Sequence, residues 1–280
     1  MKSLREIILI TLLSATALLP SCKTEEPYID PFMPVPVGAY ITEDGVQTEI
    51  GERQAELEEI IQEYNVKHVV DIIYYDELNL ERYHRVMHAT YGVSRKSANI
   101  PWDEVCEKKD EYNAVTIITE SRVGIGKPSV IIVPSTVFEK HENKQDLVSF
   151  IVDHEGMHAR DNATGLTLNG EKVTLDQVGR ELYEDIMELR AYNNQLVQIE
   201  KGRAVSEECR ELVISAYCAY HQILLVKAIN GNKYAQAGIA FGSYTPVIDL
   251  DKRKKVLIRR EEFFKGSEFE EYKECPENPK

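Results

Sequence analysis

The pattern of hydrophobic and polar positions changes several times along the 280-residue chain, and each change predicts an element. Between residues 49 and 64, apolar residues recur at helical spacing among Glu and Gln, which predicts an amphipathic helix. Three runs rich in β-branched residues, 66–75, 114–119 and 129–134, predict strands. A glycine-containing turn separates the second run from the third, so these two are expected to form a hairpin.

The second half of the chain carries mostly helical patterns. Residues 144–160, 175–201 and 206–229 each predict a helix, as does the earlier segment 78–90. Ser206 followed by two glutamates is typical of a helix start, and the Asn-Gly-Asn that follows the last helix is typical of a helix end. A polar loop joins the first two of these helices, and residues 244–258 predict a short hairpin.

The longest apolar run lies at the N-terminus, directly after Lys2 and Arg5. A basic start followed by such a run predicts a signal peptide over residues 1–21. The run ends in Leu-Pro-Ser-Cys22, which resembles the lipobox of bacterial lipoproteins, and the acidic residues that follow resemble the export tag of surface lipoproteins from Bacteroidetes-type bacteria. This resemblance implies a lipid on Cys22 and an extracytoplasmic protein anchored to the outer membrane, on its periplasmic or cell-surface face.

Four segments follow from this pattern. Residues 1–21 are the signal peptide, and residues 22–50 are rich in proline and predict a tether between the lipid and the folded body. Residues 51–265 form the predicted folded domain, and residues 266–280 form an acidic tail. Apart from the N-terminal run, no segment predicts a membrane span, so the membrane is expected to be contacted only through the lipid.

Charge and cysteine content narrow the possible partners. The chain has 47 acidic and 33 basic residues and a formal charge of −14, so it should repel phosphate backbones, and nucleic acid is not expected as a partner. In an oxidising compartment four cysteines besides Cys22 allow three disulfide pairings, and the sequence does not choose among them. Cys209 and Cys218 lie on one predicted helix, about 13 Å of helical rise apart, which is too far for a disulfide between them. The four are Cys106, Cys209, Cys218 and Cys275.

The segment that carries chemistry reads His154-Glu155-Gly156-Met157-His158. In a helix, His154 and His158 lie one turn apart on the same face. Two neutral imidazoles at this separation can bind one Zn²⁺, and Glu155 can reach a water molecule at the open coordination position. The glycine inside the helix costs about 1 kcal/mol relative to alanine, which suggests that another part of the chain approaches it closely.

This motif, placed after strands and before further helices, resembles that of the zincin metallopeptidases. The resemblance implies an α+β fold in which a small, mostly antiparallel sheet packs on a zincin-like helical subdomain, with an edge strand that aligns a peptide substrate. The metzincin branch needs Gly at position 161 and His at position 164, but the chain has Asp161 and Thr164, which excludes that branch. Arg160 also departs from the family pattern, which favours a hydrophobic residue there.

The gluzincin branch takes its third ligand from a Glu-x-x-Ala sequence on the following helix. Within residues 177–200 only Glu188, with Ala191 three residues later, fits that pattern. The resemblance therefore implies a Zn²⁺ site formed by His154, His158 and Glu188, with an open fourth position. Three acidic residues of the same helix are alternatives for the third ligand: Glu181, Glu184 and Asp185.

The resemblance also implies roles for residues around the metal. Glu155 is expected to act as general base towards a water molecule and then as general acid towards the leaving amine. Asp161 and Asp185 are available to hold the histidines by their second ring nitrogens. The developing oxyanion needs a donor besides the metal, and among four candidates His221 is favoured. The four are Tyr192, Tyr217, Tyr220 and His221.

The predicted function is therefore that of a zinc metallopeptidase acting on a peptide or protein substrate. A non-protein amide, such as a peptidoglycan stem peptide, would require the same groups. The alternative from a different class is a surface lipoprotein that acts as a binding or structural module with a non-catalytic metal site.

Overall fold

The computed structural model describes residues 46–108, 115–117, 127–140, 143–249, 254–260 and 273–275. The predicted signal peptide, the predicted lipid attachment at Cys22 and residues 22–45 of the predicted tether lie outside these ranges. Helix α1 begins at Val46, so its first residues fall within the segment predicted as tether.

The described helices, in chain order, are α1 (Val46–Glu63), the 3₁₀ turn η2 (Glu77–Asn79), α2 (Leu80–Tyr91), α3 (Arg95–Lys108), α4 (Ser135–Lys140), α5 (Lys144–Val148), the π-helical segment η4 (Ser149–Glu155), α6 (Gly156–Thr164), α7 (Leu175–Val178), α8 (Arg180–Glu200), α9 (Glu207–Ile229) and α10 (Lys233–Phe241). The described strands are β1 (Val69–Tyr74), β2 (Val115–Ile117), β3 (Ser129–Val133), β4 (Leu166–Leu168), β5 (Glu171–Val173), β6 (Tyr244–Asp249), β7 (Lys254–Arg259) and β8 (Lys273–Cys275). A mostly helical chain with small sheets agrees with the predicted α+β class.

The central sheet has the strand order β1-β3-β2. The predicted pairing of β2 with β3 is confirmed, because the two strands are antiparallel with Thr116 opposite Ile131. Strand β1 pairs with β3 in parallel, whereas the sequence predicted a mostly antiparallel sheet. Parallel neighbours need a crossover connection, and the chain between β1 and β3 supplies one that contains α2 and α3.

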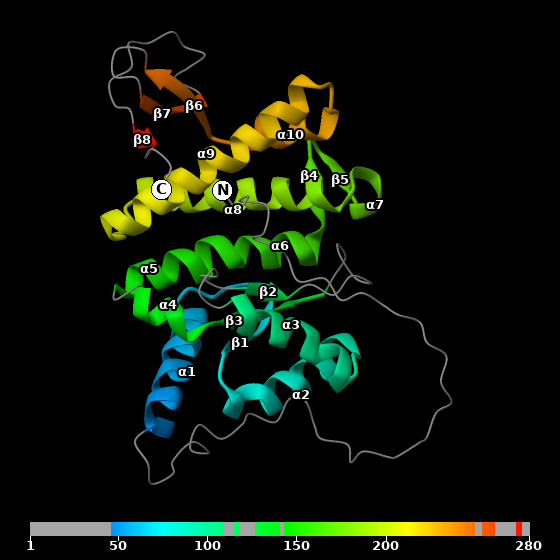
Figure 1. The fold of residues 1–280 in the computed structure, drawn as a ribbon, viewed down its shortest axis with the longest axis vertical. Coiled ribbons are helices and arrows are strands. Elements are labelled where there is room, and N and C mark those ends of the chain that lie inside the picture. The colour runs from blue at the N-terminus through cyan, green and yellow to red at the C-terminus, as the bar shows by residue number, and fades with distance from the viewer. Residues whose placement is uncertain are drawn as a thin grey trace.

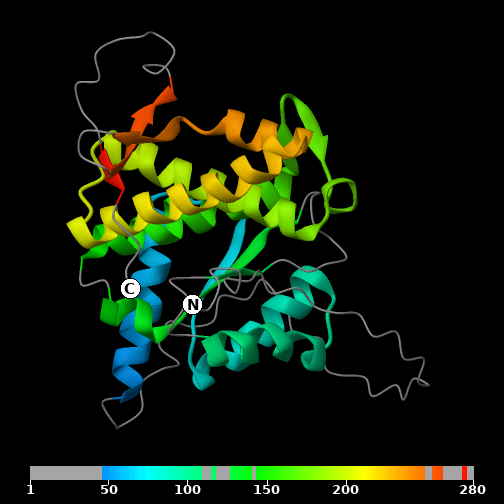
Figure 2. The same cartoon turned by 45° about the horizontal axis from the view of Figure 1, so that its top comes forward.

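Both faces of the central sheet are buried, and Figure 2 shows α1 on one side of its strands and α2 with α3 on the other. Alternate residues of β3 point to opposite faces. Val130 and Ile132 join the core formed with α2 and α3, whereas Ile131 and Val133 join the core formed with α1 and the helix that starts at α5. Every residue of β3 is therefore buried, which explains its uninterrupted apolar run.

The edge of the sheet at β1 is covered by α1. The Gln54 amide on α1 donates to the Ile72 carbonyl at 2.8 Å and accepts from the Tyr74 N–H at 2.9 Å. One side chain thus satisfies two backbone groups that an edge strand would otherwise present to another chain. Among the described strands, the other edge of the sheet is β2.

Helix α3 was not predicted, and it continues through Pro101. Proline inside a helix removes one hydrogen bond and costs about 3 kcal/mol or more. The next residue, Trp102, is buried and its ring lies 4.5 Å from the ring of Tyr75 and 4.8 Å from that of Tyr83. Burial of this aromatic cluster offsets the cost of the proline.

The helix predicted over residues 144–160 is present, and it extends from Lys144 to Thr164 as α5, η4 and α6. It runs between the central sheet and α8 (Figure 1). Ile151 packs in the core on the sheet side, and Phe150 packs in the core that contains α8 and α9. A Cβ added at Gly156 would lie 3.3 Å from the Val66 side chain, so the close approach expected at this glycine is present.

Helices α8, α9 and α10 pack together on the other side of this helix (Figure 1). The predicted helix 175–201 is divided into α7 and α8 at Gly179, whose φ of +79° favours glycine. The predicted start at Ser206 is confirmed, because its side chain accepts from the Cys209 N–H. Helix α9 is long and apolar enough to cross a membrane, but its buried residues, including Leu224, belong to this core.

Several short elements were missed or predicted as irregular. The polar loop after α6 contains the β4-β5 hairpin, and α10 follows the Asn-Gly-Asn sequence that ends α9. The predicted hairpin over 244–258 is confirmed as β6 and β7. Within the segment predicted as a loose tail, β8 pairs with β7.

Cys209 is a buried free thiol and Cys218 is disulfide-bonded, so the prediction that these two do not bond each other is confirmed.

Candidate metal centre

Three elements bring together the residues of the candidate metal centre. His154 lies at the end of η4 and His158 in the first turns of α6, while Glu188 lies in the middle of α8. The π-helical segment contains His154 and ends three residues before His158, and π-helical turns are often found at functional sites. Since α8 packs directly on this helix, Glu188 faces both imidazoles from across the helix interface.

The distances among these three side chains match the size of a metal coordination shell. The Nε2 atoms of His154 and His158 are 3.2 Å apart. Each faces a different oxygen of Glu188, at 3.5 Å from His154 and 3.3 Å from His158. A tetrahedral zinc ion with bonds of about 2.0–2.2 Å separates its ligand atoms by about 3.3–3.6 Å. The residues therefore fit Zn²⁺ in both donor chemistry and spacing.

The same three groups are strongly coupled electrostatically. Burial alone lowers the pKa of His158, but the charge of Glu188 and the hydrogen bond to it outweigh burial and raise that pKa to about 9. Burial raises the pKa of Glu188, but the charge of His158 and the hydrogen bonds to both histidines hold it well below its usual range. A buried carboxylate is thus kept ionised, as a metal ligand must be.

Gln195, one of the residues that sequence reasoning missed, fixes the orientation of His154. Its amide nitrogen donates to the Ser149 carbonyl at 3.2 Å, so its oxygen must face the histidine. That oxygen lies 3.0 Å from His154 Nδ1 and can only accept a hydrogen bond, so Nδ1 is the nitrogen that carries the hydrogen. The lone pair of Nε2 is consequently directed towards Glu188, the tautomer that metal ligation requires.

Replacing Gln195 by leucine is expected to weaken zinc binding by about 10- to 100-fold, the usual cost of losing a partner that orients a metal-bound histidine. The comparison is Gln198→Leu, which makes the same change one turn later on α8 at a half-buried position. Competition with a chromophoric chelator measures both affinities. Equal zinc affinity in the two variants would show that Gln195 does not orient His154.

Glu155, the predicted general base, is buried with 5% of its surface exposed. Its carboxylate accepts a short hydrogen bond from the hydroxyl of Thr116 on β2. The same hydroxyl lies 3.4 Å from the backbone oxygen of Glu155. Thr116 was not expected at the site, because it lies 39 residues away in the chain. It ties the predicted base to the edge strand of the central sheet.

Of the four candidate oxyanion donors, Tyr192 and Tyr220 lie close enough to Glu188 for its charge to act on both. The Tyr192 ring meets the His154 ring edge to face at 4.4 Å and stacks on Tyr220 at 5.8 Å. Burial and then the charges of Glu188 and Glu155 raise the pKa of Tyr192 well above its ordinary value. Burial and then the charge of Glu188 act on Tyr220 in the same direction. Both phenols therefore stay protonated and able to donate.

His221, the favoured candidate, has different neighbours. Its ring lies 6.1 Å from that of Tyr217, whose hydroxyl donates to the Tyr244 carbonyl at 2.7 Å. Burial and the positive charge of Arg260 lower the pKa of His221 to about 4. Among the described residues, its Nε2 atom has no hydrogen-bond partner. The structure does not bring His221 together with the three metal candidates, so its catalytic role stays a prediction of the sequence.

The two aspartates expected to hold the histidines are paired with basic residues instead. Asp161 accepts from the Arg190 guanidinium at 2.8 and 3.0 Å, and Asp185 accepts from Lys227 at 2.5 Å. The first pair is buried and joins α6 to α8 beside the centre, which helps to fix Glu188 opposite His158. The other two alternative ligands also have cationic partners, since Glu184 pairs with Arg180 and Glu181 with Lys227.

No family model, curated protein or solved structure matches this chain.

Proposed function

We propose that this chain is a zinc-dependent peptidase. The observation that carries the proposal is the arrangement of His154, His158 and Glu188 at the spacing of zinc ligands, with Glu155 one residue away from the first histidine. A set of two histidines and one carboxylate leaves a fourth position for water or substrate, which distinguishes catalytic from closed structural zinc sites. Zinc, when bound, polarises a carbonyl group and makes water more acidic.

Other residues around the metal position transfer the proton, orient the catalytic groups and stabilise the negative charge. Glu155 accepts the proton of the attacking water molecule and returns it to the leaving amine. The Thr116 hydroxyl restrains the Glu155 carboxylate, and Gln195 restrains His154. Tyr192 supplies a protonated phenol next to the carboxylates for the negative charge that develops on the carbonyl oxygen.

The substrate class is proposed from the sheet. The β1 edge is occupied by Gln54, so an extended peptide would add to the β2 edge. Thr116 of β2 bonds to Glu155, which places a peptide on that edge next to the proposed base. A peptide bound as an added strand would thus present its backbone carbonyls near the metal position.

The test is to purify the protein, quantify its zinc, and incubate it with a mixture of unstructured peptides. We expect one zinc per chain, cleavage detected by mass spectrometry, loss of cleavage on chelation and recovery when zinc is restored. His88→Ala removes an exposed histidine of α2, four residues after His84, and should change neither zinc content nor cleavage. Less than stoichiometric zinc, or cleavage that persists after chelation, would disprove the proposal. Stoichiometric zinc without any cleavage would instead favour the binding or structural module.

The N-terminal lipid and the location on the outer membrane are also proposals. They rest on the sequence of residues 1–26, which lie outside the described ranges. The disulfide at Cys218 supports an oxidising, extracytoplasmic compartment.

A further inference from the structure

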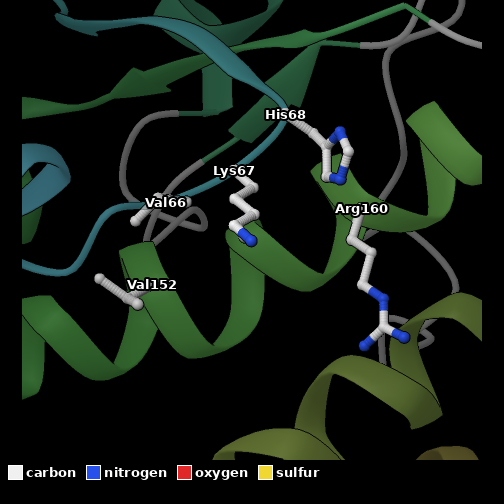
Figure 3. A pocket seen from close by; sticks show the side chains of 6 residues that line it. Val66, Lys67, His68, Val152 and Arg160 are labelled. Carbon is white, nitrogen blue, oxygen red and sulfur yellow. The ribbon is translucent and has the colours of Figure 1, made fainter.

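A pocket of about 340 Å³ lies on the opposite face of the helix that carries the histidines. Val152, Gly156 and Arg160 line it from η4 and α6, each two residues from His154 or His158 and so about 200° around the helix from them. Its other wall is the segment between α1 and β1, which contributes Val66, Lys67 and His68. Figure 3 shows this segment crossing the helix, with Lys67 lying between Val152 and Arg160 and with His68 beside Arg160.

Three nitrogen-bearing side chains line this pocket, and its six lining residues include no carboxylate. Among the described residues, Lys67, His68 and Arg160 take part in no ion pair, and all three are exposed. The carboxylates next to the pocket in sequence are already engaged, because Asp161 binds Arg190 and Asp153 binds Arg203, at 2.8 Å in each pair. The neighbouring acidic residues therefore do not neutralise the pocket.

The cations of this pocket lack the acidic partners that many other cations of the described chain have. Basic residues elsewhere in the described chain commonly have acidic partners, as in the pairs of Arg82 with Asp71 and of Lys144 with Glu59. With a formal charge of −14, the chain as a whole repels anions. A pocket with unpaired cations is a local site of positive charge in an acidic protein. An anion is therefore attracted to this pocket although the net charge of the chain repels it.

The apolar lining of the pocket indicates that its ligand has an apolar part as well as a charged group. Val66 and Val152 are half-buried, and Val66 packs closely over Gly156, so an aliphatic group can lie against the two valines. We propose that this pocket binds a small organic oxyanion, a carboxylate or a phosphate ester with a short aliphatic body. Lys67 and Arg160 bind its oxygens by charge-assisted hydrogen bonds, His68 lies beside them, and the valines contact its apolar part.

The test uses hexanoate as the probe, measured by calorimetry on the full chain. Saturable binding of one hexanoate per chain is expected, with weaker binding of hexanol, which lacks the charge, and of inorganic phosphate, which lacks the apolar body. The double variant Lys67→Met/Arg160→Met keeps unbranched side chains and removes both charges, and it should weaken hexanoate binding by at least about tenfold.

The matched control is Lys96→Met/Lys172→Met, which removes two exposed charges at other places in the fold. It should leave hexanoate affinity within about twofold, because solvent screens charges farther than about 10 Å away. Hexyl phosphate and phosphatidylglycerol vesicles then distinguish a free phosphate ester from a lipid headgroup, since only a headgroup ligand would make the protein sediment with vesicles. Equal loss of hexanoate affinity in both double variants, equal affinity for hexanol, or no saturable hexanoate binding would overturn the proposal.

Discussion

Changing Glu155 to glutamine is expected to lower the rate of peptide hydrolysis by about 10²- to 10⁴-fold, the usual contribution of a general acid–base group. Zinc content should not change, because Glu155 is not among the three grouped ligand candidates. The amide has the shape of the carboxylate and its oxygen can still accept from the Thr116 hydroxyl, so the fold should be retained. The measurements are kcat on a peptide identified by mass spectrometry and zinc content by elemental analysis.

The control for this variant is Glu171→Gln, the same change at an exposed position of β5. It should leave both zinc content and kcat as they are. A Glu155→Gln protein that keeps full activity with full zinc would show that Glu155 is not the base. A protein that loses zinc as well would show that Glu155 contributes to metal binding rather than to the chemical step alone.

Changing Glu188 to alanine is expected to lower zinc affinity by more than about 100-fold, since loss of a direct ligand should exceed the cost of losing an orienting partner. Its two oxygens lie 3.5 and 3.3 Å from the two histidine nitrogens, so no other described carboxylate is as well placed. Glu188→Gln is the companion variant, because it keeps the volume of the side chain in a buried position and removes only the charge.

Glu184→Ala is the matched control for the third ligand. Glu184 lies one turn earlier on α8 and pairs with Arg180 at 2.7 Å, so its removal should leave zinc affinity unchanged. Affinity is again measured by chelator competition, with thermal unfolding of the metal-free proteins as a check on folding. Loss of zinc in Glu184→Ala with retention in both Glu188 variants would show that the wrong carboxylate was identified.

The elements that could be predicted from sequence are those whose signal is local. Helix α9 is defined by its own capping residue Ser206 and by apolar content along its length, and β3 by a run of β-branched residues. The spacing of His154 and His158 is likewise local, because two residues four apart lie on the same face of an α-helix. Glu188 was selected by its resemblance to a family pattern, and the structure brings it to both histidines.

The elements that were missed depend on partners distant in the chain. Helix α3 contains a proline, whose cost is offset by the burial of Trp102 among aromatic rings from other elements. The parallel pairing of β1 with β3 and the addition of β8 to β7 depend on crossovers and long connections that leave no periodic signal in either strand.

The sequence by itself therefore determined the two histidines that could bind a metal, since their donor type and helical spacing belong to one short segment. Tertiary structure alone decided what supports those residues. Gln195 reaches His154 across the contact of two helices, and Thr116 reaches Glu155 from an edge strand. The physical reason is that a lone polar residue carries no pattern of its own, and its role depends on which distant side chain packing brings within hydrogen-bond distance.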